Sequence, residues 1–218
     1  MSLGLARLGV KKIILIDKDV VDLTNMNRQI LYKLTDVGLE KATTAKERLI
    51  ENHVVSEKTE VVAHQMCALV HFDKVVELIE ESTVVFNMID VGEYWDIAIQ
   101  SVCMKKKRLL IQGGTFCQQL NVDIFRPGEA CVVCSGAPQD HETIQKLMPS
   151  KIESCTNLEW IPRDRNPVAQ SSVYVCVICA EMMVSRFASL LIGDPEVEII
   201  QRFIMTVNSG DVVQFPIF

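Results

Sequence analysis

Residues 83–114 read TVVFNMIDVGEYWDIAIQSVCMKKKRLLIQGG, and this stretch decides the fold class. Two short apolar runs, 83–88 and 108–112, have the length of buried strands and flank a segment of helical period, 94–105. The same alternation of strand and helix continues outward in both directions. Because such alternation is typical of a parallel sheet covered by helices, we predict an α/β fold with a doubly wound, mostly parallel sheet.

The remaining elements follow from the same patterns. Upstream, the sequence predicts a helix at 2–9 that ends at Gly9, a strand at 13–17, a helix at 36–53 that Asp36 can cap, a strand at 59–63 and a helix at 72–81. Downstream, it predicts an antiparallel strand at 117–125, a buried helix at 172–192 and a C-terminal antiparallel hairpin turned by Ser209, Gly210 and Asp211.

Residues 126–170 lose the hydrophobic period and contain five prolines. A structureless connection of this length inside a compact domain is unusual unless it carries a site or is pinned by a ligand. We therefore predict a long crossover loop at 126–170 within a single domain that spans residues 1–218.

Composition narrows the class of protein. The 22 Lys and Arg against 28 Asp and Glu give a net charge of −6, which argues against nucleic acid as a partner. No run approaches the roughly 18 apolar residues of a membrane span, and the N-terminus does not resemble a secretory signal. We expect a cytoplasmic protein without membrane contact, whose eight cysteines are free, metal-bound or catalytic rather than disulfide-paired.

Two polar features stand out near the first predicted strand. Asp17 ends that strand, where a carboxylate can accept hydrogen bonds from both ribose hydroxyls of a nucleotide. Asn25 and Arg28 follow in a short polar segment, and Arg28 can hold a phosphate. From the residues alone, Asp17 also fits a solvated strand-end Asp, and the segment from Asn25 to Arg28 fits an ordinary polar turn better than a phosphate site.

The run from residue 8 to residue 41, LGVKKIILIDKDVVDLTNMNRQILYKLTDVGLEK, closely resembles the ThiF/MoeB-type adenylating enzymes, which activate ubiquitin and ubiquitin-like proteins. The segments VVFNMID, GGTFCQQLNVDIF and GEACVVC are similar to further family segments. The resemblance implies a doubly wound fold that binds ATP, assembled as a homodimer or heterodimer.

The resemblance also implies roles for individual residues. It gives Asp17 to the ribose, Asn25, Arg28 and Lys41 to the ATP phosphates, and Asp90 to Mg²⁺. The chemistry agrees, since adenylation moves negative charge onto the leaving pyrophosphate, and fixed cations with Mg²⁺ stabilise that charge. Without the resemblance, Lys41 reads as part of a solvated helix face.

The chain departs from the family pattern at two places. The family usually has Asn after the Mg²⁺-binding Asp, whereas this chain has Val91. The family also carries a strand and a glycine-rich loop before the helix that corresponds to residues 2–9, and neither is found here. We expect either an N-terminally incomplete sequence or a member that has lost catalysis.

The cysteines suggest two further sites. Cys131 with Cys134 and Cys176 with Cys179 form two Cys-x-x-Cys pairs, which together predict a tetrahedral Zn²⁺ site. The resemblance supports the first pair, whereas the second pair also fits a buried helix core. Cys155 lies in the long loop, where the ubiquitin-like-activating members place a thioester nucleophile, although an exposed bystander thiol fits equally well.

These features lead to one leading hypothesis and two alternatives. The leading hypothesis is an enzyme that adenylates the C-terminal carboxylate of a ubiquitin-like or sulfur-carrier protein, with ATP, Mg²⁺ and Zn²⁺, and then transfers the acyl group to Cys155. The first alternative is a non-catalytic, adenylation-like subunit that binds a partner protein or completes a heterodimer. The second is a nucleotide-dependent dehydrogenase, which explains Asp17 but not Arg28, Lys41 or the paired cysteines.

Overall fold

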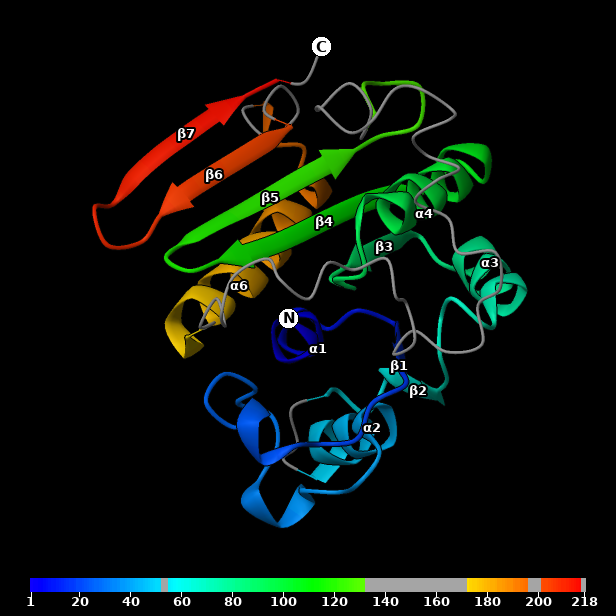
Figure 1. Ribbon diagram of the computed structural model, residues 1–218. Helices are drawn as coiled ribbons and strands as arrows, with labels where there is room; N and C mark the ends of the chain where they lie inside the picture. Colours follow the sequence, from blue (N-terminus) through cyan, green and yellow to red (C-terminus); the bar gives the residue numbers. More distant parts are fainter. Residues whose placement is uncertain (52–54, 132–171, 196–200, 217–218) are drawn as a thin grey trace.

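The computed structural model describes residues 1–51, 55–131, 172–195 and 201–216 (Figure 1). The α-helices are α1 (Ser2–Leu8), α2 (Lys41–Glu51), α3 (Phe72–Glu81), α4 (Glu93–Lys105) and α6 (Val173–Leu191), with short 3₁₀ helices η1 (Leu23–Asn25) and η2 (Leu34–Asp36). The strands are β1 (Lys12–Asp17), β2 (Glu60–Gln65), β3 (Val84–Asn87), β4 (Leu109–Phe116), β5 (Gln119–Phe125), β6 (Arg202–Thr206) and β7 (Asp211–Phe215).

The described strands form two sheets. β1 and β2 pair in parallel, with Asp17 opposite Gln65 at their carboxyl ends. The second sheet has the order β3-β4-β5-β6-β7, in which β3 and β4 are parallel and the later pairs are antiparallel. The predicted α/β class is confirmed, as are the antiparallel strand after β4 and the C-terminal hairpin. Only residues 126–131 of the predicted long loop lie within the described part of the chain.

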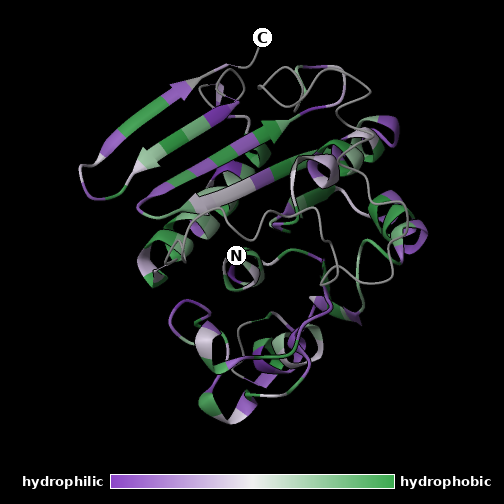
Figure 2. Ribbon diagram, in the orientation of Figure 1, coloured by the Kyte–Doolittle hydropathy of each residue, from purple (hydrophilic) through white to green (hydrophobic). Residues whose placement is uncertain are grey.

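Helices cover both faces of the five-stranded sheet. On β4, the neighbouring residues Leu110 and Ile111 are fully buried but belong to different clusters, because successive side chains point to opposite faces. Ile111 packs in the cluster that includes Met183 of α6, and Leu110 packs in the cluster that includes Trp95 of α4. Figure 2 shows the corresponding alternation of hydrophobic and hydrophilic residues along β5.

A glycine allows α6 to approach β4 closely. A Cβ atom at Gly113 would lie 3.1 Å from the Cys179 sulfur and would collide with the sulfur of Met183. By length and composition alone α6 could cross a membrane. However, Val175, Cys179 and Met183 on one face of α6 are fully buried against the sheet. The apolar residues on this face of the helix therefore pack in the core of the protein.

The predicted start of the second helix is wrong. Residues 36–53 were expected to form one helix capped by Asp36, but Asp36 ends η2 and α2 begins only at Lys41. Between them, Gly38 has φ +90, a left-handed conformation that ends helical structure. Glu40, the residue before α2, forms an isolated antiparallel bridge with Val20, which lies after β1. This contact holds Glu40 in an extended conformation, so α2 starts only at the next residue.

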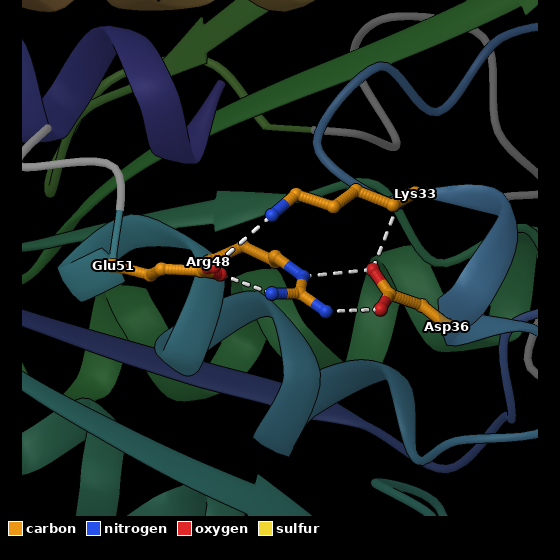
Figure 3. A network of polar contacts seen from close by, with 4 residues as sticks. All are labelled: Lys33, Asp36, Arg48 and Glu51. Atoms are coloured by element: carbon orange, nitrogen blue, oxygen red, sulfur yellow. Dashed lines mark hydrogen bonds and ion pairs between the residues drawn. The ribbon is translucent and has the colours of Figure 1, made fainter.

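Asp36 instead anchors η2 to α2 (Figure 3). Its fully buried carboxylate accepts hydrogen bonds from Arg48 Nε at 2.9 Å and from the backbone N–H of Lys33 at 2.8 Å. Lys33 Nζ and Arg48 also contact Glu51. The Arg48 guanidinium holds the pKa of Asp36 at about 2, below its ordinary value of 3.8, so this carboxylate is charged at neutral pH.

Candidate functional site

A cavity of about 790 Å³ lies at the carboxyl ends of β1, β2 and β3. Open α/β sheets bind ligands at this edge, and the volume lies within the range of small-molecule sites. The lining comprises the end of β1, the residues that follow β2 and β3, the segment before α2, and parts of α1, β4 and α6: residues 1–3, 15–19, 28–32, 41, 66, 68–69, 88–91, 115, 176–177 and 180–181.

Two aspartates mark the end of β1. Asp17 Oδ1 accepts a hydrogen bond from the backbone N–H of Asp19 at 2.9 Å, and burial raises the pKa of Asp17. The Asp19 carboxylate contacts Lys18 Nζ at 3.0 Å and Lys41 Nζ at 3.2 Å. Although burial acts to raise the pKa of Asp19, the two lysines lower it overall. The end of β1 therefore presents the side chains of two aspartates beside two lysine ammonium groups.

Lys41 is the first residue of α2 and is only 7% exposed. Its ammonium group pairs with Asp19, and its backbone N–H donates to the Asp19 carbonyl at 2.9 Å. Its own carbonyl accepts a hydrogen bond from the Tyr32 hydroxyl at 3.1 Å. The alternative of a solvated helix face for Lys41 is wrong, because the side chain is buried at the wall of the cavity.

The segment after η1 carries the second predicted cation. Arg28 Nη1 donates to the Thr24 carbonyl at 3.1 Å and to Asn27 Oδ1 at 2.9 Å, and Arg28 lines the cavity. Asn25 is not among the lining residues, yet its Oδ1 is buried without a hydrogen-bond partner in the described structure. Gln29, which sequence reasoning missed, lines the cavity and has an unpaired buried Oε1. The Gln29 amide can therefore bind a polar ligand in the cavity.

Asp90 lies on the loop after β3, and its side chain is exposed. Residues 88–91 of this loop line the cavity, so Asp90 shares it with Asp17, Arg28 and Lys41. An exposed carboxylate is an oxygen ligand of the kind that Mg²⁺ takes in nucleotide sites. The residues around the cavity therefore fit a phosphate-rich ligand with its cation.

The two members of the second Cys-x-x-Cys pair lie in different surroundings. Cys179 is fully buried in the core, and its thiol contacts the carbonyls of Gly114 at 3.6 Å and Asn121 at 3.7 Å as a donor. Burial raises the pKa of the Cys179 thiol to about 11, so without a metal the thiol is protonated at neutral pH. Cys176 faces the cavity, with its sulfur 4.0 Å from the Thr115 hydroxyl. The core interpretation of Cys179 is thus favoured.

The other cysteines leave the zinc and thioester predictions untested. Cys131 follows β5 and is half-buried, whereas Cys134 and Cys155 lie outside the described residues. Within the described ranges, no three His, Cys, Asp or Glu side chains gather as metal ligands. Cys67 is disulfide-bonded, which differs from the expectation that the cysteines are free, metal-bound or catalytic.

Sequence reasoning also missed the partners that hold the predicted residues in place. Lys18, Asp19 and Tyr32 line the cavity beside Asp17 and Lys41. For Asp19 the sequence did carry a signal, because this residue follows Asp17 by two positions at the end of a strand. No local pattern indicated that Tyr32 packs against the start of α2.

Proteins of known structure share the fold of this chain. PaaA has a TM-score of 0.74 at 23% identity, covering 100% of this chain and 68% of PaaA. MccB of E. coli, solved with ATP, has a TM-score of 0.75 at 18% identity, covering 99% of this chain and 59% of MccB. At these identities the likeness shows a shared fold.

Sequence relatives cover shorter stretches. A probable molybdopterin-synthase adenylyltransferase of Porphyra purpurea is 47% identical over 47 residues, 22% of this chain and 12% of the relative. Ubiquitin-like modifier-activating enzyme 5 of Caenorhabditis elegans is 27% identical over 140 residues, 60% of this chain and 33% of the relative. The chain thus spans a third or less of these relatives. The ThiF family matches residues 1–214, which is nearly the whole of the chain. The chain therefore belongs to the ThiF family.

Proposed function

We propose that the protein containing this chain uses ATP to adenylate the C-terminal carboxylate of a ubiquitin-like or sulfur-carrier protein. The observation that carries the proposal is the meeting of Asp17, Arg28, Lys41 and Asp90 around one cavity at the carboxyl edge of the strands. Membership of the ThiF family supports it. So do the names of relatives, which include adenylyltransferases and ubiquitin-like modifier-activating enzymes.

Each residue has a role that its surroundings suit. The Asp17 carboxylate, at the end of β1, accepts hydrogen bonds from the ribose hydroxyls. Arg28 and Lys41 bind the phosphates and stabilise the charge that develops when a carboxylate oxygen attacks the α-phosphorus and pyrophosphate leaves. Asp90 would hold Mg²⁺, which when bound neutralises phosphate charge.

The exchange of labelled pyrophosphate into ATP, dependent on the carrier protein, tests the proposal. In the full-length protein, Arg28→Ala and Asp90→Ala are expected to abolish exchange. Arg7→Ala and Asp73→Ala are matched controls, since both side chains are exposed and neither lines the cavity. Exchange at the wild-type rate in both site variants would reject adenylation, and a protein that binds the carrier without any exchange would support the non-catalytic subunit.

Three finer features belong to the same proposal. Cys155 is proposed as a thioester nucleophile, and Cys155→Ala should then abolish a thiol-sensitive adduct with the carrier while leaving exchange intact. An adduct that persists in this variant would exclude Cys155. A homodimeric or heterodimeric assembly and a cytoplasmic location are proposed on the family resemblance and on composition.

A further inference from the structure

Gln65 ends β2 beside the cavity but is not part of its lining. Its side-chain amide joins two other segments. Nε2 donates to the carbonyl of Asp19 at 2.9 Å, and Oε1 accepts a hydrogen bond from the backbone N–H of Ala42 at 3.2 Å. One amide therefore connects the end of β2 to the segment after β1 and to the first turn of α2.

The two segments that Gln65 joins carry site residues. The Asp19 carbonyl accepts both the Gln65 amide and the backbone N–H of Lys41, and the Asp19 backbone N–H donates to Asp17 Oδ1. The N–H of Ala42 lies in the first helical turn, where no intrahelical acceptor is available. Gln65 supplies that acceptor, and in doing so it fixes the start of α2 against the end of β1.

We infer that Gln65 is a positioning residue that sets the spacing between Asp17 and Lys41, an inference that rests on the proposed function. Lys41 has a long, flexible side chain, and a ligand that had to order it would lose affinity. With Gln65 in place, the backbone of Lys41 is fixed before any nucleotide arrives. The Asp19 carboxylate, 3.2 Å from Lys41 Nζ, holds the ammonium group itself, so a phosphate meets a cation that is already in place.

The test compares two substitutions of Gln65 in the full-length protein. Gln65→Leu keeps a similar volume and removes both hydrogen bonds, whereas Gln65→Glu keeps the acceptor for Ala42 and has no donor for Asp19 when ionised. Gln119→Leu, at an exposed position on β5, is the matched control. Pyrophosphate exchange gives KM for ATP and kcat, and calorimetry gives the Kd of ATP directly.

Gln65→Leu is expected to raise both the KM and the Kd for ATP about tenfold, the effect of losing one to two net hydrogen bonds. kcat should also fall, because Lys41 stabilises the charge that develops in the chemical step, so the rise in KM and in the Kd for ATP is the diagnostic result. Gln65→Glu should also raise KM, because its ionised carboxylate has no donor for the Asp19 carbonyl and repels that oxygen. A variant that only folded less well would lower kcat through the active fraction and leave KM unchanged.

A double-mutant cycle with Lys41→Ala shows whether Gln65 acts through Lys41. In the Lys41→Ala background, Gln65→Leu is expected to weaken ATP binding by less than about twofold, because the group it positions is absent. Full additivity, or an unchanged KM in Gln65→Leu, would overturn the inference while leaving adenylation intact. Failure of the wild-type protein to bind ATP would overturn the proposed function and the inference together.

Discussion

Asn87 offers the sharpest test of how the loop that carries Asp90 is held. This residue ends β3 and is buried, and its amide makes four hydrogen bonds. Nδ2 donates to Asp96 Oδ1 at 2.8 Å and to Gln112 Oε1 at 3.3 Å. Oδ1 accepts from Trp95 Nε1 at 3.0 Å and from the backbone N–H of Ile89 at 3.3 Å. The amide thus ties β3 to α4, to β4 and to the loop at the cavity.

The magnitude follows from the groups that lose their partner. Asn87→Leu leaves the Trp95 indole N–H, on a side chain 2% exposed, and the Ile89 N–H without this acceptor. Asp96 and Gln112 lose a donor as well, but both are only half-buried and therefore add less. Each buried unpaired group costs about 1 to 3 kcal/mol, and the longer Ile89 bond belongs at the low end of that range. We expect Asn87→Leu to lower the free energy of unfolding by about 3 kcal/mol, with little difference between about pH 4.5 and about pH 8.

Asn87→Asp keeps both acceptor contacts but places a carboxylate within hydrogen-bond distance of Asp96. Burial and the like charge raise the folded-state pKa of the new carboxyl above its unfolded value of about 3.9. A carboxyl with a raised folded pKa stabilises the fold when protonated. The variant should therefore be nearest to wild type at low pH and lose stability as pH rises, by about 1.4 kcal/mol for each unit of pKa shift.

Urea denaturation followed by tryptophan fluorescence, at about pH 4.5 and about pH 8, measures both variants against wild type. The deficit of Asn87→Asp should grow with pH, whereas that of Asn87→Leu should stay constant. Both variants should also reduce pyrophosphate exchange, because the loop of Asp90 loses an anchor. A pH-independent deficit in Asn87→Asp, or a deficit below about 0.5 kcal/mol in Asn87→Leu, would refute the reasoning.

Three further predictions concern other parts of the fold. The pKa of Asp36 is about 2 in the folded protein, against an ordinary value of 3.8. The contribution of this carboxylate to stability is therefore present above about pH 4 and is lost as pH falls toward about 2. Denaturation curves of wild type and Asp36→Asn should converge between these two pH values. Gly113→Ala should destabilise the protein by about 1 to 3 kcal/mol through its collision with Met183, and thermal melts should show that Met183→Ala adds less in this variant than in wild type. Cys179→Ala should leave the zinc content unchanged in metal analysis. Loss of one zinc per chain in this variant would instead support the predicted four-cysteine zinc site.

Local patterns in the sequence were sufficient for much of the fold. The helix predicted at 72–81 is observed with the same bounds, and Gly9 ends α1 in a left-handed conformation, as its position indicated. The alternation within 117–125 identified an antiparallel strand, which is observed at Gln119–Phe125. These features depend on side-chain period and on single-residue backbone preferences, which are properties of a few neighbouring residues.

Only the tertiary structure decided which distant residues meet. Asp36 reads locally as a helix cap, but it pairs with Arg48, twelve residues away, and the chain turns at Gly38 before α2 begins. Cys179 reads as a zinc ligand or a core residue, and its burial against β4 favours the core.

The same division holds at the cavity. The sequence placed Asp17 at a strand end and marked Arg28, Lys41 and Asp90 through resemblance, but it gave no sign that Gln65 joins the segments of Asp17 and Lys41. Hydrogen bonds between residues 23 to 46 positions apart form only when packing brings their segments together. The sequence by itself determined the elements and the candidate chemistry, whereas the burial of side chains between those elements decided which candidates share a site, because burial depends on the whole chain at once.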